Sequence, residues 1–210
     1  MYKIKRERNR SRVETKIIHH SRKIKQIGIF CLFLFFIFVN FAHGFKPYTT
    51  FATVLEILDG DTFLVLIDDE PQKLGLFGID APEELWGPKL KWDADICGVS
   101  KIHMGSLGQL ATQYTKTLLH KGDQIKVTVY EKGRLDELMA IVCLPDGTFL
   151  NERIVQDGYA CVSKKRPKLL PETEFKELEE LLEDAKKNKY GLWRNAYKTM
   201  ECLCQYQWKD

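Results

Sequence analysis

The feature that most constrains the fold is a succession of five short β-rich segments, each closed by a turn. They cover residues 50–58, 62–67, 73–79, 124–130 and 138–144. Asp59-Gly60-Asp61 separates the first two segments, a turn at residues 68–71 separates the second from the third, and Pro82 stops the third. Short strands with turn signals at such spacing are typical of small barrels and sandwiches.

Helical patterns separate and follow these strands. Apolar residues recur at three- to four-residue spacing from Leu107 to Leu119, a short helix is predicted over residues 151–156, and a long amphipathic helix over about 171–189. Residues 84–104 give no regular pattern and are expected to be irregular. The order of three strands, a helix, two strands and further helices predicts an α+β fold: a five-stranded OB-fold β-barrel with about three helices, whose loops bind ligands at one rim.

The N-terminus is ordered like a targeting signal. A basic stretch at residues 3–25 precedes an apolar run at residues 27–41, and Ala42-His43-Gly44 forms a small-x-small pattern. The apolar run is shorter than the roughly 20 residues of a membrane span, but the basic stretch is long for a signal peptide. Two predictions stay open: a signal peptide cleaved after Gly44, or a membrane anchor with its basic side inside. Both place residues 45–210 outside the cytoplasm, secreted, periplasmic or anchored.

The chain therefore divides into residues 1–44, a domain at 45–197, and a tail at 198–210 that contains Cys202-Leu203-Cys204. Residues 1–26 carry ten basic and two acidic side chains, whereas residues 27–210 carry 22 basic and 27 acidic ones. This excludes the broad basic footprint of a generic DNA-binding protein. We expect a monomer.

Five cysteines follow the apolar run, namely Cys97, Cys143, Cys161, Cys202 and Cys204. An exported location permits disulfides, and an odd number leaves at least one thiol without an internal partner. Whether Cys97 is paired stays open. The Cys-x-Cys pair has no histidine near it, which argues against a zinc site.

Three acidic residues lie at predicted strand ends. Asp61 opens the second strand, and Asp80 and Glu83 follow the third. In a barrel these ends can meet at one rim, where carboxylates would suit a hard cation such as Ca²⁺, and a carboxylate free of metal can accept a proton from water. Asp-Gly-Asp is also a common turn, so from spacing alone a purely structural explanation competes with the catalytic one.

Four motifs of this chain resemble those of the staphylococcal (thermo)nuclease family. They are Asp59-Gly60-Asp61-Thr62, Gly78-Ile79-Asp80-Ala81-Pro82-Glu83, Leu144-Pro145-Asp146-Gly147-Thr148 with Asn151-Glu152, and Gly191-Leu192-Trp193. The resemblance covers about residues 50–195 and itself implies an OB barrel. It further implies a calcium-dependent nuclease acting on DNA or RNA. In that case Asp61 and Asp80 are calcium ligands, Ala81 offers its backbone carbonyl, and Glu83 is the general base.

Two arginines of that family are missing from their expected positions. The one five residues before the second-motif Asp falls on Gly75, and the other, counted back from Asp146-Gly147 without gaps, falls on Leu138. Arg134 can supply a guanidinium if the hairpin is shifted. Lys73 shares the strand face of Gly75, although an ammonium does not reproduce the bidentate fork of arginine.

Three functions stay open: a nuclease weakened by the missing arginines, an inactive nuclease-like module that binds nucleic acid or another polyanion, and a protein-interaction module. Lys164 and Arg166, in the basic run at 164–168, are candidates to follow a phosphate backbone. Trp86 and Trp92 are expected to pack rather than to stack on bases.

Overall fold

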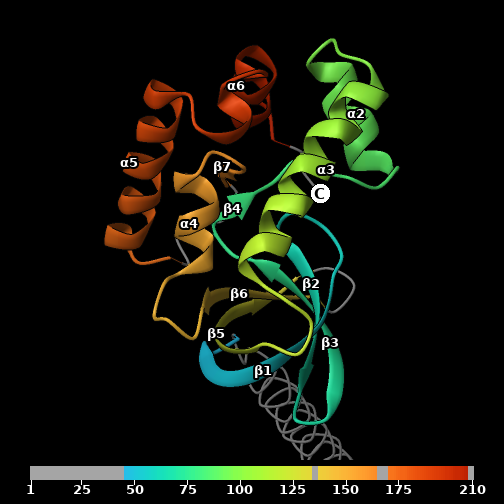
Figure 1. Ribbon diagram of the computed structural model, residues 1–210. Coiled ribbons are helices and arrows are strands. Elements are labelled where there is room, and N and C mark those ends of the chain that lie inside the picture. Colours follow the sequence, from blue (N-terminus) through green and yellow to red (C-terminus); the bar gives the residue numbers. More distant parts are fainter. Residues whose placement is uncertain (1–44, 134–136, 165–169, 208–210) are drawn as a thin grey trace, which may run out of the picture. The chain divides into compact units, whose positions relative to one another are not determined.

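The computed structural model describes residues 45–133, 137–164 and 170–207 (Figure 1). Phe45–Asp210 forms a unit of its own. The predicted signal or anchor segment lies outside the described residues. Among the helices that the structure describes, none combines the length and apolar character needed to cross a membrane.

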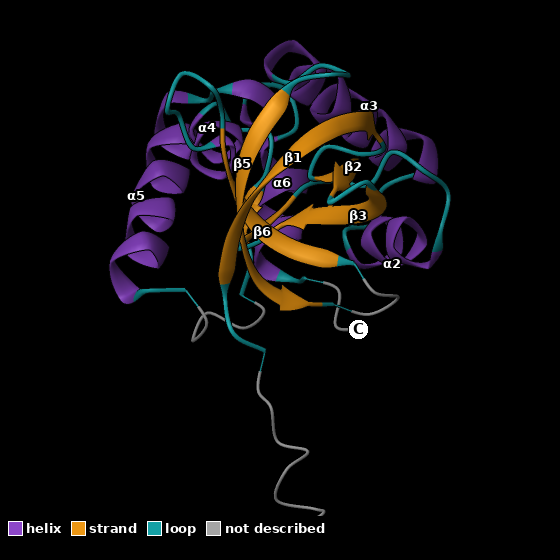
Figure 2. Cartoon of the chain, turned by 90° about the horizontal axis from the view of Figure 1, so that it is seen from below, coloured by secondary structure: helices purple, strands orange, loops and turns teal. Residues whose placement is uncertain are grey.

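Five strands close into a barrel in the order β1-β2-β3-β6-β5, which Figure 2 shows from below. They are β1 (Tyr48–Ile57), β2 (Thr62–Ile67), β3 (Glu70–Leu76), β5 (Gln124–Lys132) and β6 (Leu138–Cys143). Alternate residues of β2, namely Phe63, Val65 and Ile67, are buried, as expected for strands with one face toward a core. All neighbouring pairs are antiparallel except β3 and β6. The predicted α+β fold with a five-stranded OB-type barrel is confirmed.

The third predicted strand is in fact two strands. β3 ends at Leu76, and β4 (Ile79–Asp80) leaves the barrel to pair with β7 (Cys161–Val162). Gly78 adopts a φ of 83° between them, a conformation that glycine adopts without steric cost. The break redirects the chain, so that Asp80 lies opposite Cys161 instead of continuing along the barrel wall.

The helices are α2 (Pro88–Ile96), α3 (Lys101–Leu118), α4 (Leu150–Gln156), α5 (Glu172–Asn188) and α6 (Tyr197–Gln205), with a 3₁₀ turn at Gly191–Trp193. The described part of the chain therefore holds five α-helices rather than about three. The expectation that residues 84–104 are irregular was wrong, because α2 and the first turn of α3 lie there. Pro88 suits the first turn of α2, but only Leu90, Asp93 and Ala94 of that helix are buried.

The C-terminal segment is a packed part of the domain. Helix α6 covers most of the segment interpreted as a tail, and two disulfides fix it. Cys202 pairs with Cys97, directly after α2, and Cys204 pairs with Cys161 of β7. Cys97 is therefore paired, and Cys143 is the free cysteine among the described residues.

Candidate active site at the end of the barrel

The first acid is positioned by the turn between β1 and β2. A Cβ atom on Gly60 would lie 2.9 Å from the Ala111 Cβ and 3.0 Å from the Ala81 Cβ, so the turn packs tightly under α3. The Thr115 hydroxyl donates to the Gly60 carbonyl at 2.7 Å. Asp61, which follows, accepts the backbone N–H of Ala81 at 2.8 Å through Oδ2. This bond joins the two motifs that lie 20 residues apart in sequence.

The second group of acids is positioned by β4 and α3. Asp80 lies in β4 opposite Cys161. The backbone of Glu83 lies directly against Gly108 of α3, where a Cβ atom would come closer than 3.0 Å to atoms of Glu83 and Glu84. The close approach of α3 thus determines where the chain from Asp80 to Glu83 runs.

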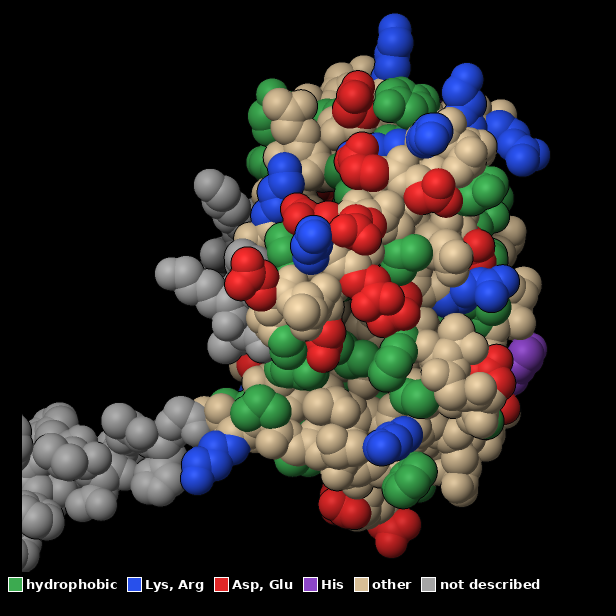
Figure 3. All heavy atoms as spheres, turned by 90° about the vertical axis from the view of Figure 1, so that its left-hand side faces the viewer, with side chains coloured by type: hydrophobic (Ala, Val, Ile, Leu, Met, Phe, Trp, Pro, Cys, Tyr) green, Lys and Arg blue, Asp and Glu red, His purple; other side chains and the backbone are tan. Residues whose placement is uncertain are grey.

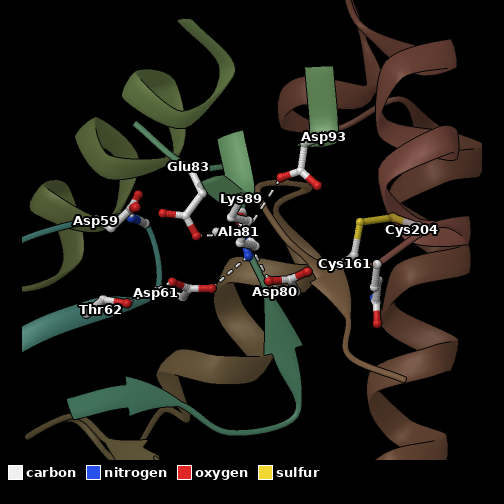
Figure 4. Close-up of polar contacts among 12 residues, drawn as sticks. Asp59, Asp61, Thr62, Asp80, Ala81, Glu83, Lys89, Asp93, Cys161 and Cys204 are labelled. Atoms are coloured by element: carbon white, nitrogen blue, oxygen red, sulfur yellow. Dashed lines mark hydrogen bonds and ion pairs between the residues drawn. A yellow bond between two sulfur atoms is a disulfide. The ribbon is translucent and has the colours of Figure 1, made fainter. Parts of the chain in front are cut away.

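Lys89 places its ammonium among these acids (Figure 4). Its Nζ lies 2.7 Å from Glu83 Oε1, 3.1 Å from Asp80 Oδ1 and 4.0 Å from Asp93 Oδ2. It also donates to the Ala81 carbonyl at 3.0 Å. Lys89 is not recognisable as a site residue from the sequence, because it lies in the segment interpreted as irregular and no motif includes it.

Burial and mutual repulsion shift the pKa values of these groups. Burial raises the pKa of Asp61 to about 7, with Glu83 and Asp80 adding to the shift and Lys89 opposing it. Burial, Asp61 and Glu83 raise the pKa of Asp59 to about 8. Burial also acts to raise the pKa of Glu83, but Lys89 and a hydrogen bond from Asp59 outweigh it, and the pKa falls below its usual value. At neutral pH Glu83 is therefore an ionised carboxylate beside a largely protonated Asp59.

Lys89 stays charged in this environment. Burial opposes its charge, but Asp80, Glu83 and Asp61 together raise its pKa well above the usual lysine value. The candidate site therefore holds a permanent positive charge supplied by the chain itself.

The chemistry of the donor atoms fits Ca²⁺. Asp61, Asp80 and the Ala81 carbonyl offer only oxygen, which hard cations prefer, and the Lys89 ammonium is a stand-in cation that already contacts Asp80 and Ala81. Within the described residues, however, no three His, Cys, Asp or Glu side chains are arranged to hold a metal ion. Asp80 and Glu83 instead contact the ammonium, and Asp61 accepts the Ala81 N–H.

The two positions expected for arginine carry no guanidinium. Gly75 lies on the wall of β3, and Leu138 is buried at the start of β6. Next to them Lys73 Nζ lies 3.1 Å from Glu137 Oε1, so the candidate phosphate-binding lysine is already paired. Arg134 lies outside the described residues. Of the arginines that the structure describes, Arg153 of α4 pairs with Asp157, which caps the end of that helix.

The remaining candidates are not brought to the acids by any described contact. Lys164 is exposed after β7 and bonds to Gln207 through its backbone N–H, and Arg166 lies outside the described residues. The packing expected for Trp86 was wrong, since Trp86 is 70% exposed, whereas Trp92 is partly buried. On the face shown in Figure 3, acidic and basic side chains are mingled rather than gathered into a broad basic field.

The fold and site together define a class: an OB-fold barrel with a cluster of carboxylates from the turn between β1 and β2, from β4 and from the chain that follows β4. Comparison with known families makes this specific, because the profile of the family described as "Staphylococcal nuclease homologue" matches residues 73–195. The chain belongs to the staphylococcal nuclease family.

Three relatives illustrate the similarity. An "Uncharacterized endonuclease" of Escherichia coli is 28% identical over 145 residues, which are 68% of this chain and 76% of that protein. The "Thermonuclease" of Staphylococcus hyicus is 26% identical over 144 residues, 68% of this chain and 75% of that protein. "Endonuclease YhcR" of Bacillus subtilis is 27% identical over 160 residues, 73% of this chain but 12% of that larger protein.

Proposed function

We propose that this protein is a calcium-dependent nuclease that hydrolyses phosphodiester bonds of DNA or RNA, slowed by the missing arginines. One observation carries the proposal: Asp80, Glu83 and the Ala81 carbonyl surround one cationic centre, and Asp61 is joined to them through the Ala81 N–H. The names of the relatives, endonuclease and thermonuclease, support a nucleic acid as substrate.

The residues of this site have separate roles in the proposed reaction. Asp61, Asp80 and the Ala81 carbonyl would hold Ca²⁺, which when bound supplies positive charge to a phosphate oxygen. Glu83 accepts the proton of the attacking water; in the metal-free protein its pKa is lowered because Lys89 and Asp59 outweigh the effect of burial. Asp59, whose pKa lies at about 8, is mostly protonated there and hydrogen-bonds Glu83, which orients the base.

The missing guanidiniums explain why the proposed reaction is slow. Arginines that contact a transferring phosphoryl group contribute roughly 10³–10⁵ in rate in another class of phosphoryl-transfer enzyme. Lys73 is the nearest substitute in sequence, but its charge is paired with Glu137, and a lysine offers no bidentate fork.

The test is a cleavage assay with the full-length protein in mild detergent. Single-stranded DNA, double-stranded DNA and RNA are incubated with Ca²⁺ or with chelator. Wild type is compared with Glu83→Gln and with Glu56→Gln, which alters an exposed glutamate of β1. The proposal expects calcium-dependent cutting by wild type and Glu56→Gln, and none by Glu83→Gln. Cutting that persists in Glu83→Gln, or absence of cutting by folded wild type with Ca²⁺, contradicts it.

The second candidate is an inactive nuclease-like module that binds nucleic acid or another polyanion. The Lys73–Glu137 ion pair favours it, because an acid stands beside Gly75 where the family presents arginine to phosphate. This module would bind DNA without cutting it. Its affinity should fall steeply with salt, as phosphate contacts require. If this protein instead binds another protein, with an affinity that does not depend on salt, it is a protein-interaction module.

We also propose that residues 45–210 lie outside the cytoplasm. The two disulfides support this location, because such bonds persist in oxidising compartments and are rare in the cytosol. Cells are stripped of any outer membrane or wall while the cytoplasmic membrane stays intact. Protease added to them should digest this part of the chain. Protection equal to that of a cytoplasmic marker would contradict the proposal.

A further inference from the structure

Lys89 contacts the same atoms that the proposed metal would need. Its Nζ lies 3.1 Å from Asp80 Oδ1 and 3.0 Å from the Ala81 carbonyl oxygen, both of which are proposed calcium ligands, and 2.7 Å from Glu83 Oε1. The Lys89 side chain is 19% exposed. The ammonium is therefore a nearly desolvated member of the cluster rather than a surface charge that meets it occasionally.

Helix α2 holds the ammonium in this place. Lys89 is the second residue of α2, and Asp93, one turn later, lies 4.0 Å from Nζ with 3% of its side chain exposed. Residues four apart lie on the same helix face. The carboxylate of Asp93 thus supports the ammonium from the side of α2, while Asp80 contacts it from β4 and Glu83 from the chain that follows β4.

An ammonium and a calcium ion cannot share these ligands. Calcium sits about 2.3–2.6 Å from its ligand oxygens, and the ammonium already lies 3.1 Å from Asp80 and 3.0 Å from Ala81. Both cations would then approach each other closely in a site with little water, where like charges repel strongly. One of the two must leave before the other binds.

We propose that Lys89 is a resident cation that competes with the divalent metal for Asp80 and the Ala81 carbonyl. Metal binding at the site then requires the ammonium to withdraw. Lys89 determines how much Ca²⁺ the protein needs and neutralises the carboxylates when the metal is absent. This inference rests on the proposed calcium site.

The test compares Lys89→Met with Lys91→Met in the full-length protein. Methionine keeps an unbranched apolar stem but removes the charge, and Lys91 is an exposed lysine of the same helix. Each protein is freed of metal, titrated with Ca²⁺ in a calorimeter, and melted with and without Ca²⁺. Lys89→Met should bind Ca²⁺ with a Kd at least tenfold lower than wild type, and Lys91→Met should match wild type. In chelator, Lys89→Met should melt below wild type, and added Ca²⁺ should raise its melting temperature more than that of wild type.

The outcomes separate this inference from the proposed function. Calcium binding by wild type with an equal or lower Kd than Lys89→Met overturns the competition and leaves the calcium site standing. Binding by Lys89→Met but not by wild type supports the competition and overturns calcium dependence of the natural protein. No binding by any of the folded proteins overturns both.

Discussion

Replacing Gly108 by alanine should destabilise the protein, although the same change in the middle of a helix ordinarily stabilises it. Alanine usually gains about 0.8–1.0 kcal/mol over glycine at an interior helix position. Here the new Cβ would lie closer than 3.0 Å to the carbonyl carbon and oxygen of Glu83 and the amide nitrogen of Glu84. These are backbone atoms, so no side-chain rotation can relieve the overlap.

Overpacking of this kind typically costs about 1–3 kcal/mol. The upper end of this range applies because backbone atoms must move. After subtraction of the helix gain, the free energy of unfolding should fall by about 2 kcal/mol. For a domain of this size that corresponds to a melting temperature about 4–8 °C lower. Because the displaced atoms belong to Glu83 and Glu84, the same substitution should also weaken calcium-dependent stabilisation.

Gly105 is the matched control on the same helix. The nearest atoms to a Cβ there are 3.6 Å and 3.7 Å away, which is ordinary contact, so Gly105→Ala should raise the melting temperature by about 2–4 °C. Thermal melts followed by circular dichroism measure both variants. If Gly108→Ala is as stable as Gly105→Ala, the reasoning that α3 is packed against the Glu83 backbone is refuted.

Two further predictions concern pH and the disulfides. The folded-state pKa values of Asp59 and Asp61 are raised to about 8 and about 7. Between about pH 4 and pH 8 these two groups therefore bind more protons in the folded protein than in the unfolded chain. As a result, their contribution to the free energy of unfolding falls as pH rises toward 8. Calcium-free melting temperatures should therefore fall less between pH 5 and pH 8.5 in Asp59→Asn than in wild type, and an unchanged slope would refute the shift. Reduction of Cys161–Cys204, which closes 43 residues, should cost about 4 kcal/mol by the chain-entropy relation, or about 8–16 °C in melting temperature. Cys161 of β7 also lies opposite Asp80 of β4 in the two-stranded sheet. Cys204→Ser should therefore reduce the rise in melting temperature that Ca²⁺ causes. An undiminished rise in that variant would show that β7 does not position Asp80.

The barrel was predictable because its signals are local. The alternation of Ile125, Val127 and Val129 and the turns between strands follow from period-two burial and turn chemistry. The apolar character of the third segment misled at its end, where it continues through Phe77 to Ile79, the first residue of β4. There the positive φ of Gly78 and pairing with a strand more than 80 residues later decide the path.

Other features depend on tertiary contacts that no local pattern reports. Helix α2 was missed because it buries little apolar surface, chiefly Leu90 and Ala94. Lys89 could not be recognised as part of the site without that helix, since only its position near the start of α2 brings the ammonium to Asp80 and Glu83. Asp61 and Asp80 were singled out by their strand ends and by the family motifs. The hydrogen bond of Asp61 to Ala81, in contrast, became visible only in the structure.

The central claim is that the chain keeps the acids of a nuclease but lacks arginine at the two positions where the family is expected to present it to phosphate. The most direct measurement introduces a guanidinium beside Gly75 as Glu137→Arg, because the Glu137 side chain lies next to that position. Calcium-dependent DNA cleavage is compared with wild type and with Lys126→Arg, an exposed position of β5. We predict faster cleavage by Glu137→Arg alone, abolished when Glu83→Gln is added, because the new arginine acts only through the existing acids. A folded Glu137→Arg protein that cuts no faster than Lys126→Arg, or that cuts equally well without Glu83, would contradict the claim.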